Sequence, residues 1–85
     1  MTADESLRHA AAVVRDRRSS YGDPADLFGR VAARWPQVIG AEVTPVQVGL
    51  CLLDLKLARL AADPHHLDSL VDVAGYAACV REISR

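Results

Sequence analysis

The sequence predicts an all-α protein, a compact bundle of about four helices that forms a single domain over residues 1–85. Apolar residues recur at spacings of three and four through most of the chain, which is the period of a helix. A capping residue precedes a proline at Asp23-Pro24 and again at Thr44-Pro45, a pattern typical of helix starts. Hydrophobic residues make up 51% of the chain, enough for a real core.

The N-terminal half is expected to form two helices separated by Gly22. The first runs from Met1 to Ser20, with acidic residues near its start and arginines near its end, an order that suits the helix dipole. The second runs from Pro24 to about Ile39. Pro36 lies inside its pattern, so we expect a kink or a break near Trp35.

The central stretch, Val46 to Ala62, is apolar at nearly every step and is interrupted by Asp54, Lys56 and Arg59. It is too short and too interrupted to span a bilayer. Its apolar sector is wider than a single stripe, and such a helix is normally surrounded by neighbours on several sides. Gly49 in its interior indicates a close helix crossing. So much apolar surface on a small chain also favours self-association, with a homodimer as the expected form.

The last helix is expected from about His66 to Ile83, after a short turn at Asp63-Pro64. Asp68, Asp72 and Tyr76 follow one another at spacing four. Residues at that spacing share one face of a helix, so the two carboxylates and the phenol should lie in a line.

Two cations of the central helix, Lys56 and Arg59, are three residues apart and project from one side. A short turn makes the two helices antiparallel, which would bring these cations close to the aspartate face. Opposite charges gathered in this way can form a ligand site, a metal site beside a phosphate clamp, or an interhelical salt-bridge network. All three interpretations fit the spacing.

If the cluster is a site, its chemistry suits a phosphorylated nucleotide with Mg²⁺. Mg²⁺ prefers oxygen ligands and usually takes only one or two protein carboxylates, leaving its other positions to water and substrate phosphates. A lysine or arginine would neutralise phosphate charge, and a tyrosine could stack on the base. The candidate metal ligands are Asp54, Asp68 and Asp72, and the candidate ligand-binding residues are Lys56, Arg59, Tyr21 and Tyr76.

Charge and cysteine usage indicate where the protein works. The chain has ten basic and eleven acidic residues and a net charge of −1, so no direct DNA binding is expected. The one basic run, Arg15 to Arg18, can be cations at the favourable end of the first helix or a phosphate-binding patch, and the first interpretation is favoured. Cys51 and Cys79 lie in apolar helical runs and are expected to be buried free thiols in a reducing compartment. No signal-peptide pattern is present, and we expect a cytoplasmic protein without membrane contact.

Several motifs occur in an order that resembles a known family. They are Tyr21-Gly22-Asp23-Pro24, Phe28, Trp35, Thr44-Pro45, Leu55-Lys56-Leu57-Ala58-Arg59 and the run from Asp68 to Tyr76. The pattern is similar to the small phage and prophage proteins grouped as "nucleotide modification associated" helical domains, over about residues 8 to 80. The resemblance implies a compact all-α fold and a phage or prophage setting, in a family without an established activity.

A weaker resemblance is to the all-α nucleoside triphosphate pyrophosphatases, the MazG-like group. That group holds Mg²⁺ with paired glutamates on one helix and a Glu-x-x-Asp motif on another. Here Asp68 and Asp72 are four residues apart rather than three, and Asp54 has no Glu-Glu partner. The chain therefore has fewer carboxylates than that chemistry uses, which puts hydrolysis in doubt.

Two functions of different classes fit these observations. The sequence does not determine whether the chain is an enzyme. The first is a phage-type helical protein that binds a nucleotide or a nucleotide-derived phosphate with help from Mg²⁺. The alternative is a non-enzymatic module that binds a protein, such as a phage-encoded, anti-CRISPR-like inhibitor of a host defence complex. A cleft that holds the charged cluster favours the first function, and an exposed acidic or apolar helix face favours the second.

Overall fold

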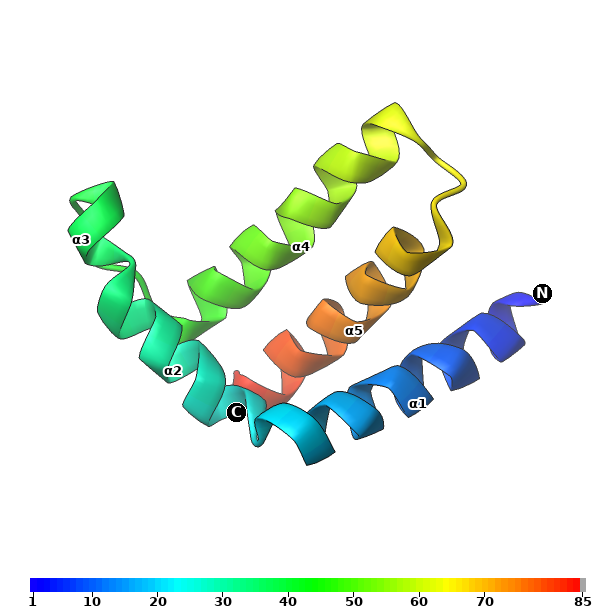
Figure 1. Cartoon of the computed structure of the whole chain (residues 1–85), viewed down its shortest axis with the longest axis horizontal. Coiled ribbons are helices and arrows are strands. Elements are labelled where there is room, and N and C mark those ends of the chain that lie inside the picture. The colour runs from blue at the N-terminus through cyan, green and yellow to red at the C-terminus, as the bar shows by residue number, and fades with distance from the viewer. Residues whose placement is uncertain (85) are drawn as a thin grey trace.

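The computed structural model describes residues 1–84 and confirms an all-α fold (Figure 1). Its helices are α1 (Ala3–Tyr21), α2 (Pro24–Arg34), α3 (Pro36–Ile39), α4 (Pro45–Ala62) and α5 (Leu67–Ile83). Within the described residues, no helix is long and apolar enough to cross a membrane. Four of the helices match the four that the periodicity predicts, and α3 is a single turn.

Capping residues begin helices α1, α2 and α4, and two of them, Asp23 and Thr44, are the predicted ones. The Thr2 side chain accepts a hydrogen bond from the backbone N–H of Glu5 at the start of α1. Asp23 caps α2, whose first residue is a proline. Thr44 caps α4 through a reciprocal pair of bonds with Gln47, each 2.9–3.1 Å long. These bonds satisfy backbone N–H groups that have no partner inside a helix, so each helix has a defined first residue.

The break predicted near Trp35 is confirmed. Helix α2 ends at Arg34, and α3 begins at Pro36 and ends at Ile39; the Gly40 that follows has a left-handed φ of 80°. Proline has no N–H to continue the hydrogen bonding of α2, and glycine adopts a left-handed conformation without a steric cost. Together these two residues set α3 apart from α2 as a separate turn.

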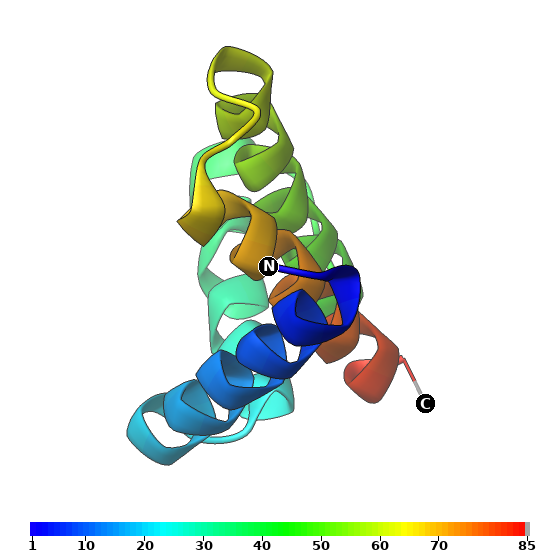
Figure 2. The ribbon, with the colours of Figure 1, turned by 90° about the vertical axis from the view of Figure 1, so that its right-hand side faces the viewer.

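Helices α4 and α5 lie side by side and antiparallel, and this pair is the centre of the fold (Figure 1). Helix α1 runs along the far side of α5, and α2 crosses near the N-terminal end of α4. Figure 2 shows α2 and the C-terminal end of α1 on one side of the α4–α5 pair, the left-hand side of that view. The two sides of the pair are therefore covered unequally.

The core is centred on Phe28 and Val48, which are 3% and 0% exposed. The predicted close crossing at Gly49 is confirmed, because a Cβ atom there would lie 2.6 Å from the Val80 side chain and 3.1 Å from that of Phe28. Trp35 packs against the same core. Glycine at position 49 lets α2, α4 and α5 meet at one point.

Two expectations for the central helix are wrong. Among the described elements, α4 contacts only α2 and α5, so it is not surrounded on several sides. Its leucines at positions 50, 55 and 57 are each about half exposed. Cys51 is exposed rather than buried, because it lies on the side of α4 that no helix covers.

Candidate functional site

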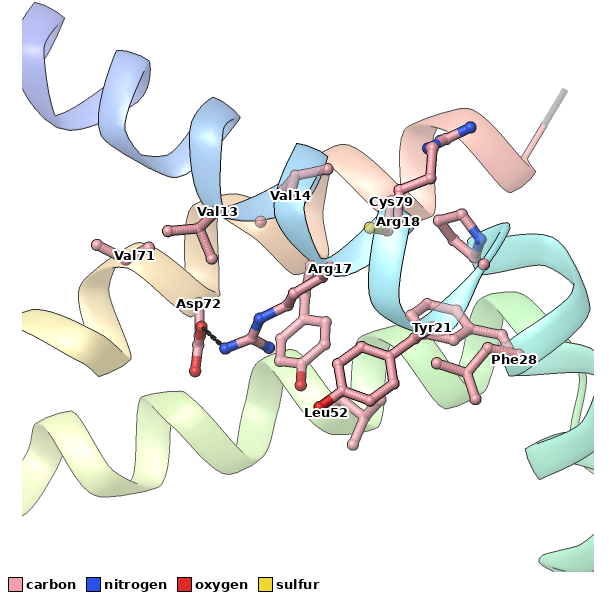
Figure 3. A pocket seen from close by; sticks show the side chains of 15 residues that line it. Val13, Val14, Arg17, Arg18, Tyr21, Phe28, Leu52, Val71, Asp72 and Cys79 are labelled. Carbon is pink, nitrogen blue, oxygen red and sulfur yellow. Dashed lines mark hydrogen bonds and ion pairs between the residues drawn. The ribbon is translucent and has the colours of Figure 1, made fainter.

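Asp72 of α5 is a buried charged residue, with 10% of its side chain exposed. One carboxylate oxygen lies 3.0 Å from Nζ of Lys56, whose side chain is 16% exposed. The other oxygen lies 3.3 Å from a guanidinium nitrogen of Arg17, a contact drawn in Figure 3. Each oxygen of Asp72 therefore has its own cation, one from α4 and one from α1.

A pocket of about 590 Å³ opens beside this ion pair, between α1, α2, α4 and α5 (Figure 3). Most of its wall is apolar, formed by side chains such as Val13, Leu52 and Phe28. Its polar lining residues are Arg17, Arg18, Tyr21, Asp72 and Tyr76. An apolar cavity of a few hundred cubic ångströms with a few convergent polar groups is the usual form of a small-molecule site.

Three of the predicted site residues line this pocket: Tyr21, Asp72 and Tyr76. Tyr21 stands at the end of α1 with 65% of its surface exposed, while Tyr76 is partly buried with its ring 6.5 Å from that of Phe28. Lys56 belongs to the site through its ion pair with Asp72, although it does not line the pocket. The spacing of four predicted that Asp72 and Tyr76 share one face of α5, and the short turn predicted the approach of Lys56 to Asp72.

The other predicted residues, Asp54, Asp68 and Arg59, are exposed and lie outside the pocket. Asp54 is two residues from Lys56, which puts it on the opposite side of α4. Asp68 lies in the first turn of α5, one turn before Asp72. Over residues 1–84 no three histidine, cysteine or acidic side chains are close enough to hold a metal together. The aspartates expected to share Mg²⁺ are therefore dispersed.

The sequence interpretation left Arg17 and Arg18 out of the site, because it favoured charges placed at a helix end over a phosphate-binding patch. Arg17 reaches Asp72, and Arg18 pairs with Glu82 at the other end of the pocket. The hydrogen bond and the charge of Glu82 raise the pKa of the Arg18 guanidinium, so it stays cationic. The signal was present in the spacing, because Arg17 follows Val13 by one helical turn and shares its face.

Two side chains near the site, Ser69 and Cys79, are of nucleophilic types, but their contacts are those of structural residues. Ser69 is fully buried, and its hydroxyl lies 2.8 Å from Nδ1 of His66, which also accepts the backbone N–H of Ser69. This contact caps the start of α5. Cys79 lines the pocket, and burial raises the pKa of its thiol. The imidazole beside Ser69 serves as a helix cap rather than as the base of a nucleophile, because Nδ1 already accepts the backbone N–H of Ser69 and the hydroxyl is fully buried.

Comparison with known proteins shows that the chain is similar to two phage proteins. It is 35% identical over 79 residues to the Gene 55 protein of Mycobacterium phage L5, covering 91% of this chain and 51% of that protein. It is 32% identical over 68 residues to the Gene 55 protein of Mycobacterium phage D29, covering 80% of this chain and 45% of that one. The chain thus spans about half the length of these curated relatives.

These relatives confirm the phage setting that the resemblance implied. No solved structure matches the chain. One family model matches residues 5–84, nearly the whole chain, and its description states no activity. The chain therefore belongs to the family described as Domain of unknown function (DUF6378).

Proposed function

We propose that the chain binds a nucleotide, or a nucleotide-derived phosphate, in the pocket between α1, α2, α4 and α5. The observation that carries this proposal is the lining of the pocket, where Tyr21 and Tyr76 share an apolar cavity with Arg17 and Arg18. Figure 3 shows the Arg17 guanidinium beside Asp72, on the same side of the cavity. A nucleotide has the matching parts, a flat aromatic base and an anionic phosphate. Apolar walls with a few placed polar groups suit such a ligand.

Each part of the ligand has a candidate partner in the pocket. The rings of Tyr21 and Tyr76 offer a surface on which a base can stack. The Arg17 side chain is 52% exposed, so it can turn toward a phosphate while Lys56 keeps Asp72 paired. Guanidinium groups bind phosphate oxygens with two parallel hydrogen bonds. The phosphate-binding role thus moves from Lys56 and Arg59 to the arginines of α1.

Mg²⁺ enters the proposal as a second partner of the phosphate. Asp72 is the one predicted metal ligand that lines the pocket, and Mg²⁺ often uses a single protein carboxylate. Binding there would require Asp72 to exchange Arg17 or Lys56 for the metal. A Mg²⁺-dependent affinity that disappears in Asp72→Asn would assign the metal to this carboxylate.

The test is a calorimetric titration with a panel of nucleoside mono- and triphosphates, with and without Mg²⁺. We expect one nucleotide to bind, and Arg17→Ala to weaken it roughly tenfold, the value of one lost charged contact of ~1.4 kcal/mol. Arg59→Ala is the matched control, because Arg59 is exposed and outside the pocket. An assay for released pyrophosphate on the same samples then separates binding from catalysis. The proposal would be refuted if no nucleotide in the panel binds, or if Arg17→Ala and Arg59→Ala lose the same amount of affinity.

The alternative function, a protein-binding module such as an inhibitor of a host defence complex, would use a different feature. Leu50 and Leu57 of α4 and Leu70 of α5 are each nearly half exposed. Large exposed apolar patches are typical of interaction surfaces. If no nucleotide binds and the chain is also a monomer, this patch stays uncovered and the protein-binding function becomes the better one.

A further inference from the structure

The chain exposes more surface than a monomer of its size should. Its accessible surface is 5911 Å² for a mass of 9.2 kDa. A monomeric globular protein of that mass exposes about 4,900 Å². The radius of gyration is 13.5 Å, against about 12 Å for a compact domain of this length. The excess of about 1,000 Å² is comparable to what one subunit buries in a stable interface, about 800 Å².

Much of the exposed apolar surface belongs to one side of the α4–α5 pair, which we call the leucine face. Its residues are Leu50, Leu53 and Leu57 of α4 and Leu67 and Leu70 of α5. The four outermost, at positions 50, 57, 67 and 70, are 46–51% exposed. A shallow hollow bounded by Leu7, Leu67 and Leu70 extends the face toward the start of α1.

The leucine face lies opposite the pocket. On α4, Leu52 and Lys56 point to the pocket and to Asp72, whereas Leu50 and Leu57 lie more than a quarter turn further round the helix. On α5, Asp72 points to the pocket, and Leu70 lies about half a turn away from it. Helices α1 and α2 border the pocket, so in the described part of the chain no helix packs over the leucine face.

The core beneath these helices is small. The buried apolar residues of the described chain are Ala10, Phe28, Ala32, Val48 and Val71. Two alanines, two valines and one phenylalanine give little hydrophobic stabilisation for a domain of this length, since burial contributes about 25 cal/mol for each Å². Covering the leucine face would add the apolar burial that this core lacks.

We infer that a second copy of this chain covers the leucine face, so that two α4–α5 pairs pack into a four-helix interface. Interfaces between obligate homodimer subunits are more apolar than those between transient partners. The arc of α4 from Leu50 to Leu60 through Leu53 and Leu57 contains no charged residue, so two copies can meet there without burying unpaired charge. A two-fold dimer also closes, so the leucine face would not stay open for growth into fibres.

The experiment is sedimentation equilibrium of the full chain over a wide range of concentration. We expect a dimer, and a melting temperature that rises with protein concentration, since dissociation accompanies unfolding. Leu57→Glu or Leu70→Glu should raise the dissociation constant on the order of 100-fold, because each interface then buries two new carboxylates. Circular dichroism of each variant then checks that it keeps its helices.

Val38→Glu is the matched control, because Val38 is 89% exposed on α3, away from the leucine face. It should leave the dimer unchanged. A monomer at every attainable concentration overturns the inference, and so does a dimer that both leucine variants leave intact. If the leucine variants unfold, the concentration dependence of melting in the unmodified chain decides the matter. The pocket lies on the other side, so nucleotide affinity in Leu57→Glu tests the proposed function separately.

Discussion

The two sides of the α4–α5 pair differ in the chemistry of their side chains and in whether other helices pack against them. On the pocket side, α1 and α2 enclose a carboxylate that is paired with two cations, Asp72 with Lys56 and Arg17. On the other side, leucines at spacings of three and four are nearly half exposed, and no helix in residues 1–84 covers them. The same two helices thus present an enclosed polar centre and an open apolar surface.

This difference shows which groups depend on their surroundings. A buried carboxylate is tolerated only when cations and hydrogen bonds compensate its lost hydration, so Asp72 requires α1 and α4 in their observed places. An exposed leucine imposes no such geometric requirement. We therefore compare two residues of the same type, one enclosed and one exposed. Substitution of the enclosed residue should change the stability or reactivity strongly, and substitution of the exposed one should change it little.

The largest effect is expected at Asp72. Replacing it with alanine leaves the Lys56 ammonium, with its side chain only 16% exposed, without its partner. Breaking such a pair should lower the free energy of unfolding by about 3 kcal/mol, measured by urea denaturation. Asp68→Ala, one turn earlier and exposed, should change it by less than about 0.5 kcal/mol.

A rescue variant separates the ion pair from a simple packing loss. Adding Lys56→Met to Asp72→Leu removes both charges and fills the space with apolar atoms, which should recover more than half of the lost stability. Equal responses of Asp72→Ala and Asp68→Ala would mean that Asp72 is not enclosed in solution, and the contrast between the two sides would fail.

An intermediate effect is expected at the crossing of α2, α4 and α5. A Cβ atom on Gly49 would come within 2.6 Å of the Val80 side chain, so Gly49→Ala should cost about 1 kcal/mol net of its better helix propensity. Gly29 lies in α2 with no atom within 4 Å of a new Cβ. Gly29→Ala should therefore stabilise the chain by up to ~1 kcal/mol, measured as a shift in urea midpoint. Stabilisation by both substitutions would refute the close crossing.

The smallest effect concerns the two thiols. Burial raises the pKa of Cys79, so less of it is thiolate at a given pH, and its reaction with an alkylating reagent should be slow. Cys51 is exposed and should react first. Mass spectrometry of Cys51→Ser and Cys79→Ser at pH 8 compares the two rates. A nucleotide in the pocket should slow Cys79 further and leave Cys51 unchanged, whereas equal rates would show that Cys79 is not enclosed.

The amino-acid sequence by itself determined the helices. Caps at Thr2, Asp23 and Thr44, the break at Pro36 and the close approach at Gly49 are local features whose signals lie within a few residues. Helix spacing also predicted that Asp72 would approach Lys56, because a short turn forces α4 and α5 to be antiparallel. Local geometry is short-ranged, so it can be inferred from the chain alone.

Only the tertiary structure decided which cations meet Asp72 and which side of the central helix is covered. Arg17 and Asp72 are 55 residues apart in the sequence, and their contact depends on the angle at which α1 crosses α5. No spacing rule gives that angle, so the sequence assigned the phosphate-binding role to Lys56 and Arg59, although Arg59 is exposed near the C-terminal end of α4 and does not line the pocket. The sequence also predicted that other helices would enclose α4. An apolar composition indicates that a helix surface will be buried, but it does not indicate which helix or subunit buries it.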